Sequence, residues 1–156
     1  SILRATKYHP RGERILNMRG PHPDYVRLSR PLEQIQAMNE HTLTVAMMES
    51  QRGLDNLDAI CRVPGLDAVM IGPDDLSQAL GVPGDMKHAR MVEATEHVIA
   101  TCQRHDVPWG FSCQDPASAA EWISRGIRWM PYANDAAALF NTFSSAAQEL
   151  KRGAGR

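Results

Sequence analysis

The chain has 156 residues, of which 43% are hydrophobic and 22% are charged, a composition typical of a globular protein. Its 17 basic and 18 acidic side chains nearly cancel, and no apolar run reaches the roughly 20 residues that cross a bilayer. These features argue against nucleic-acid and membrane partners, and we expect a single domain over residues 1–156. The three cysteines, Cys61, Cys102 and Cys113, lack CxxC spacing, which indicates reduced thiols in a cytoplasmic protein.

Short apolar runs alternate with helical periodicity along most of the chain. A stretch rich in proline and glycine predicts a loop over residues 9–25, and a helix is expected from about Pro31 to Asn39. Four apolar runs then predict buried strands, over residues 43–48, 67–72, 107–112 and 127–132. Helical spacing or capping residues predict the helices that follow, over 54–61, 76–80, 92–102, 115–126 and 135–150. This alternation predicts an α/β fold whose parallel strands are joined by right-handed crossovers.

Carboxylates follow two neighbouring predicted strands. Glu49 closes the first strand, and Asp74 and Asp75 follow the second after a Gly-Pro turn. Functional side chains gather at the carboxyl ends of parallel strands, where converging carboxylates repel one another unless a cation lies between them. The pattern favours a metal site in which one Asp is a ligand and the other is a helix cap or faces the substrate. A solvated Glu49 and an Asp that only caps the following helix are the alternatives.

Several ordered motifs carry a resemblance to a known family. They are ESQRGLDNLDAI at 49–60, VPGLD at 63–67, IGPDDLS at 71–77 and LG at 80–81, with KYHPRG at 7–12 and DY at 24–25. The chain resembles the HpcH/HpaI aldolase family along essentially its whole length. These are class II pyruvate aldolases related to 2-dehydro-3-deoxyglucarate aldolase and 4-hydroxy-2-oxoheptanedioate aldolase.

The resemblance implies roles for particular residues. In the family, the Glu that closes one strand and the Asp before Leu-Ser bind a divalent metal, and here these are Glu49 and Asp75. The turn and short helix between them offer backbone groups to pyruvate, which assigns Gly72 and Asp74 to the substrate. The implied cofactor is Mg²⁺, Mn²⁺ or Co²⁺. The implied reaction is the cleavage of a 4-hydroxy-2-oxo acid to pyruvate and an aldehyde.

Three positions depart from the family pattern. Met47 replaces the Gln that helps to hold pyruvate, which puts the usual substrate contact at that position in doubt. Asp74 replaces a more common Ala, Gly or Ser and adds charge beside an anionic substrate. Ser112 stands where Leu is frequent in the pocket for the aldehyde.

The resemblance also sets an expectation for the fold. The family folds as a TIM (β/α)₈ barrel of about 250 residues, so we expect the chain to hold the C-terminal half of one, about four βα units. The family's general-base His and its Arg lie on early strands that this chain lacks, and none of its six histidines follows a predicted strand. No catalytic acid or base is therefore assigned, and residues 1–156 alone are expected to be inactive.

The partners and two other functions follow from the same comparison. The resemblance implies a homo-oligomer, a hexamer with exchanged C-terminal helices, and the apolar face of Leu139, Phe143 and Leu150 fits that exchange and ordinary core packing equally well. One alternative function is that of a relative of citrate lyase or malyl-CoA lyase. The other is a non-catalytic half-barrel that binds an ion or a partner.

Overall fold

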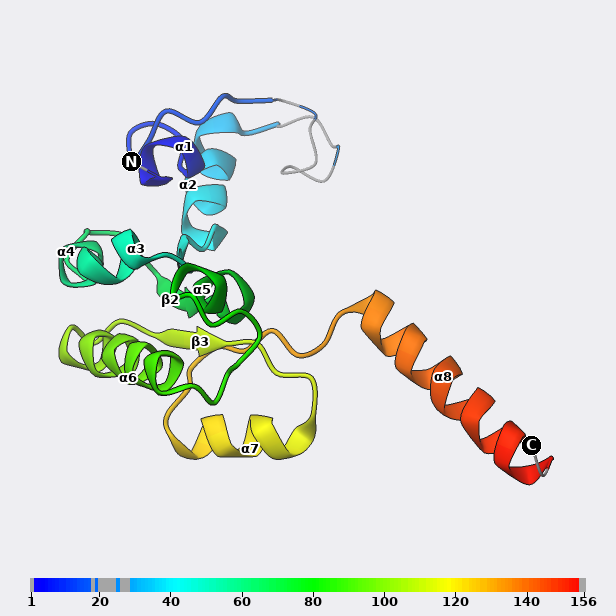
Figure 1. The fold of residues 1–156 in the computed structure, drawn as a ribbon. Coiled ribbons are helices and arrows are strands. Elements are labelled where there is room, and N and C mark those ends of the chain that lie inside the picture. The colour runs from blue at the N-terminus through cyan, green and yellow to red at the C-terminus, as the bar shows by residue number, and fades with distance from the viewer. Residues whose placement is uncertain (1, 18, 20–24, 26–28, 155–156) are drawn as a thin grey trace. The chain divides into compact units, whose positions relative to one another are not determined.

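The computed structural model describes residues 2–17, 19, 25 and 29–154 (Figure 1). The chain divides into two compact units, Ser1–Trp109 and Gly110–Arg156. The elements in chain order are α1 (Ile2–Thr6), α2 (Pro31–His41), β1 (Val45–Met48), α3 (Gln51–Asp55), α4 (Leu57–Cys61), β2 (Ala68–Ile71), α5 (Pro73–Ala79), α6 (Ala89–Arg104), β3 (Trp109–Phe111), α7 (Pro116–Ser124) and α8 (Asp135–Gly153). Within the described ranges, no helix combines the length and apolarity that crossing a bilayer requires.

The strands form a three-stranded sheet in the order β1–β2–β3, which agrees with the predicted alternation. Strands β1 and β2 are parallel, with a register that runs from Val45 opposite Ala68 to Met48 opposite Ile71. The core of the first unit lies where α4 and α6 pack together over β2. Its fully buried apolar side chains come from these elements, α5 and β3, and include Leu57, Val69, Ile71, Leu76, Val98 and Trp109. Each of the aliphatic side chains contributes about 1.5–3 kcal/mol through burial.

The single helix predicted over residues 54–61 is two short helices, and the sequence-based prediction was wrong on this point. The break lies at Asn56, whose backbone leaves the helical region at φ −105° and ψ 6°. Its side-chain amide donates a hydrogen bond to the carbonyl of Arg52 at 2.8 Å, which gives the chain an alternative to a continuous helix. The apolar spacing continues across the break because Leu54 and Leu57 are both buried.

The fourth predicted strand, 127–132, is reduced to two isolated parallel bridges. Gly110 pairs with Trp129 and Cys113 pairs with Tyr132, so both bridges have the same register although the ladder is interrupted between them. Pro131 lies in the interrupted stretch, and proline has no N–H to donate to a ladder. The carbonyl of Pro131 still accepts a hydrogen bond from the N–H of Cys113 at 3.1 Å. The chain is therefore extended here without forming a full strand.

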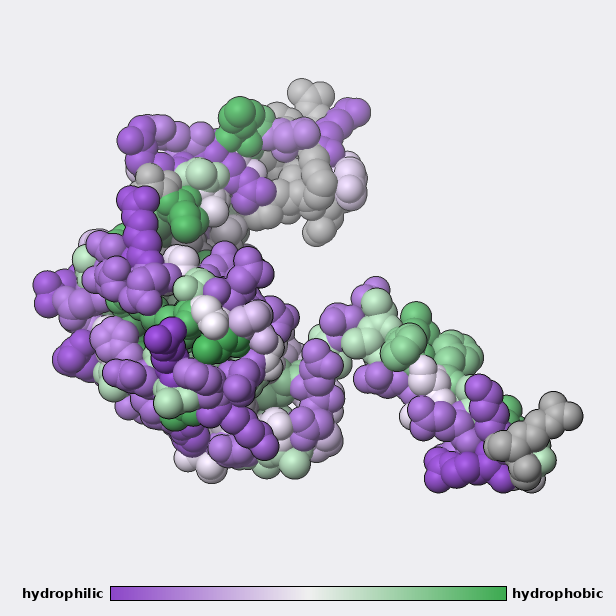
Figure 2. Space-filling model, in the orientation of Figure 1, coloured by the Kyte–Doolittle hydropathy of each residue, from purple (hydrophilic) through white to green (hydrophobic). Residues whose placement is uncertain are grey.

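The helix signals of the second unit are confirmed. Asp115 caps α7 by accepting a hydrogen bond from the N–H of Ser118 at 2.9 Å, and Gly126 beyond its end has φ +86°. Helix α8 is amphipathic, and none of its described side chains is buried. Figure 2 shows its apolar residues gathered along the helix. The large ones are between 60% and 75% exposed: Leu139, Phe140, Phe143 and Leu150.

The segment that precedes the sheet is held by Asn39 of α2. The Asn39 side chain accepts a hydrogen bond from the N–H of Tyr8 at 2.7 Å and donates one to its carbonyl at 3.0 Å. The buried ammonium of Lys7 donates to the carbonyls of Asn39, at 2.8 Å, and of Thr42. The loop expected over 9–25 is confirmed for residues 9–17, 19 and 25, and its other positions lie outside the described residues.

Candidate metal and substrate site

Glu49 and Gly72 stand opposite each other just beyond the carboxyl ends of β1 and β2. The ladder ends with Met48 opposite Ile71, and the N–H of Gly72 donates a further hydrogen bond to the carbonyl of Met48 at 3.0 Å. Because the two strands are parallel and in register, the residues that follow them share one edge of the sheet. The two strand ends that carry Glu49 and Gly72 thus lie at one edge of the sheet, whereas the convergence of the Glu49 and Asp75 carboxylates on one cation stays a prediction.

Gly72 leaves a space that the Glu49 side chain borders. A Cβ atom at Gly72 would lie 3.2 Å from Cβ of Glu49, 3.2 Å from its Oε2 and 3.2 Å from Cγ of Met47. The backbone of Gly72 has φ −94°, which any residue adopts, so the requirement for glycine is one of space. The missing side chain lets a carboxylate oxygen approach the main chain of the turn.

The two aspartates lie in the first turn of α5, and neither is its N-cap. The N-cap residue is Gly72, with no side-chain cap hydrogen bond, and Pro73 occupies the first helical position. The alternative in which one Asp only caps this helix is therefore excluded. Asp74 and Asp75 are exposed and lie in the first turn, a position where negative charge is favourable.

The carboxylates at this edge are free to take a further ligand. Within the described residues, Glu49, Asp74 and Asp75 make no hydrogen bond or ion pair through their carboxylates, although Glu49 is half-buried. Carboxylate oxygens are the ligands that hard divalent cations prefer, and Mg²⁺ is often held by only one or two of them. No set of three or more His, Cys, Asp or Glu residues is arranged for a metal in the described ranges. A two-carboxylate site with substrate and water as the other ligands fits these residues.

Met47 lines the same edge of the site. It is paired with Met70 across the ladder and is 49% exposed, and its Cγ borders the space at Gly72. A thioether offers only a weak acceptor, so this side chain contributes apolar contact and not the hydrogen bond of the amide that the family carries there.

The histidines lie elsewhere in the chain. His105 follows α6, His88 caps its start by accepting from the N–H of Arg90 at 3.2 Å, and His97 is within it. His9 is in a turn, and His41 ends α2. The sixth, His22, lies outside the described residues. None of the described histidines follows a strand, as predicted.

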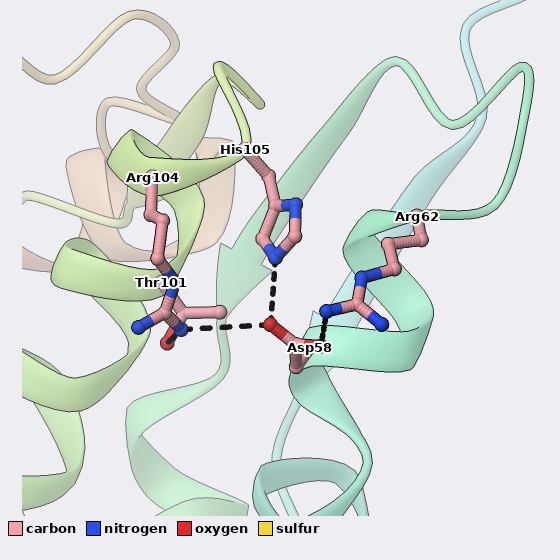
Figure 3. Close-up of polar contacts among 5 residues, drawn as sticks. All are labelled: Asp58, Arg62, Thr101, Arg104 and His105. Carbon is pink, nitrogen blue, oxygen red and sulfur yellow. Dashed lines mark hydrogen bonds and ion pairs between the residues drawn. The ribbon is translucent and has the colours of Figure 1, made fainter.

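A polar cluster that no sequence motif indicated joins α4 to the end of α6 (Figure 3). One oxygen of Asp58 lies 2.7 Å from Nε2 of His105, and the other is 2.7 Å from the guanidinium of Arg62. Arg104 lies 3.6 Å from Asp58 and donates to the hydroxyl of Thr101 at 3.2 Å. The hydrogen bond to His105, aided by the arginines, lowers the pKa of Asp58 below its ordinary value. The cluster joins two packed helices and lies on elements other than those that carry Glu49, Gly72 and Asp75.

Comparison with known proteins identifies the family. The model of the HpcH/HpaI aldolase/citrate lyase family matches residues 1–141. That match covers most of the chain and includes Glu49, Gly72 and Asp75. The chain belongs to the HpcH/HpaI aldolase/citrate lyase family.

Individual relatives agree with this assignment. A 5-keto-4-deoxy-D-glucarate aldolase from Klebsiella pneumoniae subsp. pneumoniae is 32% identical over 152 residues, which is 94% of this chain and 54% of that protein. The solved HpcH/HpaI aldolase from Desulfitobacterium hafniense DCB-2 matches with a TM-score of 0.82 at 30% identity, over 96% of this chain and 57% of that one. The solved citrate synthase SbnG matches with a TM-score of 0.81 at 24% identity, over 99% and 58%, which shows a shared fold alone. The chain spans about half the length of the curated relatives it matches.

Proposed function

We propose that the protein to which this chain belongs is a divalent-metal-dependent aldolase that cleaves a 4-hydroxy-2-oxo acid to pyruvate and an aldehyde in the cytoplasm. The observation that carries the proposal is the half-buried carboxylate of Glu49 against Gly72, which has no partner among the described residues, with Asp75 on the first turn of the next helix. Membership of the family and the 32% identity to a named aldolase support the same reaction class. The parallel β1–β2 pair and the fold matches support a C-terminal half of a TIM barrel as its framework.

Each residue of the site has a proposed task. The carboxylates of Glu49 and Asp75 hold Mg²⁺, Mn²⁺ or Co²⁺, and Gly72 and Asp74 contact the carboxylate of the 2-oxo acid through their main chain. Met47 packs beside the substrate. A bound divalent cation supplies positive charge to the enolate that develops as the C3–C4 bond breaks.

No residue of this chain is proposed as the general base. The described histidines are at turns, helix ends or within α6, and none follows a strand. We therefore expect residues 1–156 by themselves to be inactive, since a positioned base contributes about 10²–10⁴-fold. The test is deuterium exchange at C3 of pyruvate, followed by NMR with Mg²⁺ or Mn²⁺ present. Exchange at enzyme-like rates by residues 1–156 alone would contradict this expectation.

Two alternative functions can be distinguished from the proposed aldol cleavage by their substrates. The family description includes citrate lyase, which favours a reaction on a citrate-like or CoA-linked substrate as the second candidate. A non-catalytic role is the third. Cleavage of an acyl-CoA thioester substrate, with none of a 4-hydroxy-2-oxo acid, would favour the second. Metal binding without turnover of either substrate would favour the third.

The assembly is proposed to be a homo-oligomer, a hexamer by resemblance to the family. The exposed apolar face of α8 supports this, because a row of large apolar side chains in water is unfavourable until a second copy covers it. Light scattering on the full-length protein and on its Phe143→Asp variant measures the assembly. An unchanged mass for the variant would rule out this face as the contact.

The function itself is tested with a purified full-length protein and 5-keto-4-deoxy-D-glucarate, the substrate in the name of the relatives. Pyruvate release is followed by a coupled dehydrogenase assay. Activity should disappear in EDTA and return with excess Mg²⁺ or Mn²⁺. Activity that survives complete removal of divalent metals would refute the metal-dependent mechanism.

A further inference from the structure

Ser77 is fully buried in α5, two residues beyond Asp75, and its hydroxyl acts as both a hydrogen-bond donor and an acceptor. It donates a hydrogen bond to the backbone carbonyl of Asp74 at 2.7 Å and accepts one from the N–H of Gly84 at 3.0 Å. A side chain that is 0% exposed cannot contact a substrate or a metal in the site. Its effect on the site has to pass through the groups that it holds.

The group held on one side is the peptide that carries Asp75. The carbonyl of Asp74 and the N–H of Asp75 belong to one planar unit, so fixing the carbonyl also fixes where the Cα of Asp75 lies. The carboxylate of Asp75 is exposed and has no partner among the described residues. Its position therefore depends on how firmly the main chain of this turn is held.

The group held on the other side is the loop between α5 and α6. The N–H of Val82 donates to the carbonyl of Ser77 at 2.9 Å, so Ser77 accepts hydrogen bonds from two N–H groups of this loop. Gly84 has φ +76°, a conformation that favours glycine and turns its N–H toward the helix. Ser77 thus joins the loop to the first turn of α5 through one short chain of hydrogen bonds.

We infer that Ser77 is a positioning residue for the metal site: its hydroxyl holds the Asp74–Asp75 peptide so that the Asp75 carboxylate is presented beside Glu49. This inference rests on the proposed function, because it assumes that Asp75 is a metal ligand. Partners that orient metal ligands change metal affinity by about 10–100-fold when they are removed. Ser77→Ala is the variant to use, because it removes the hydroxyl and adds no atom to a filled space.

The experiment measures Mn²⁺ affinity by electron paramagnetic resonance on the full-length protein without substrate. Ser77→Ala is expected to bind Mn²⁺ at least 10-fold more weakly than the wild type. Amide hydrogen exchange at Gly84 should become faster, because its acceptor is lost. The matched control is Thr101→Val, which removes a buried hydroxyl from α6, where Thr101 is 1% exposed and accepts a hydrogen bond from Arg104. The control should lower the unfolding temperature without changing Mn²⁺ affinity.

The outcomes separate the two proposals. Wild-type binding that is lost in Glu49→Gln but unchanged in Ser77→Ala would leave the metal site standing and overturn the role of Ser77. Equal weakening in Ser77→Ala and Thr101→Val would also overturn it, since general destabilisation would then explain the loss. A wild-type protein that binds no Mn²⁺ would overturn both the proposed function and this inference.

Discussion

Gly72→Ala is the substitution that probes the candidate site most sharply, because the added methyl group would enter the space between Glu49 and Met47. It would lie 3.2 Å from three atoms, Cβ and Oε2 of Glu49 and Cγ of Met47, where ordinary contacts are 3.4–4 Å. The neighbours must therefore move by a few tenths of an ångström. Met47 is half-exposed and can yield, but Cβ of Glu49 is fixed to the main chain that leaves β1.

The expected loss of Mn²⁺ affinity follows from the narrow range of ligand distances that metal sites tolerate. Ligand distances in such sites hold to about ±0.2 Å, so a shift of this size in Glu49 weakens coordination. We expect the dissociation constant for Mn²⁺ to rise about 10-fold, which corresponds to about 1.4 kcal/mol. Overpacking adds a loss of about 1–3 kcal/mol in the free energy of unfolding.

The assay is a Mn²⁺ titration of the full-length variant, with thermal unfolding measured in parallel. Gly153→Ala is the matched control, because a Cβ there meets no atom within 4 Å and the position is at the end of α8. The control should leave Mn²⁺ affinity unchanged. If Gly72→Ala also binds Mn²⁺ as tightly as the wild type, the reasoning that places the ion beside Glu49 is wrong.

Three further predictions follow from other parts of the chain. Asp75→Ala should abolish both metal affinity and turnover, whereas Asp74→Ala should raise the KM for the 2-oxo acid more than it weakens Mn²⁺ binding. An equal loss of Mn²⁺ binding in the two variants would mean that both residues are ligands or that the wrong Asp was chosen. Because the pKa of Asp58 is lowered by folding, its stabilising effect is present above about pH 3.9 and is lost as the pH falls through the folded value. Asp58→Asn should therefore lower the unfolding temperature at pH 7, and this difference from the wild type should shrink as the pH falls below about 3.9. A difference that does not shrink would argue against the charge as the cause. Burial raises the pKa of Cys102 to about 12 and the pKa values of Cys61 and Cys113 above their ordinary value. A thiol reagent at pH 8 should therefore label no cysteine in the folded protein and all three after unfolding. Rapid labelling of the folded protein would show that the core is open.

The strand ends and helix caps could be predicted from the sequence because their signals are local. Glu49 and the Gly72 turn each end an apolar run, and parallel strands bring such ends to one edge. Asp115 followed by Pro116 is a local cap pattern, and it forms as predicted. The three cysteines are free, which also agrees with their spacing.

The errors have particular physical causes. Apolar spacing continues through Asn56, so it could not show that the Asn56 side chain would bind the main chain and end the helix. Residues 127–132 have the composition of a strand, but Pro131 removes a ladder donor. Capping of α5 by Asp74 or Asp75 was an alternative and not the prediction, and it is excluded because Gly72 occupies the N-cap position.

Long-range polar contacts left no sign in the sequence. Asp58 and His105 are 47 residues apart and meet only because α4 packs on α6. The hydroxyl of Ser77 belongs to a recognisable motif, but its bond to Gly84 depends on how the following loop turns.

Glu49 and Asp75 are proposed to hold one divalent cation at the carboxyl ends of β1 and β2. The most direct test is a crystal structure of the full-length protein soaked with Mn²⁺ and pyruvate, with anomalous scattering used to locate the ion. A single peak is expected, with carboxylate oxygens of both residues about 2.0–2.6 Å away. A peak elsewhere, or carboxylates of Glu49 and Asp75 that lie more than about 8 Å apart, too far for ligands at those distances to share one ion, would contradict this proposal.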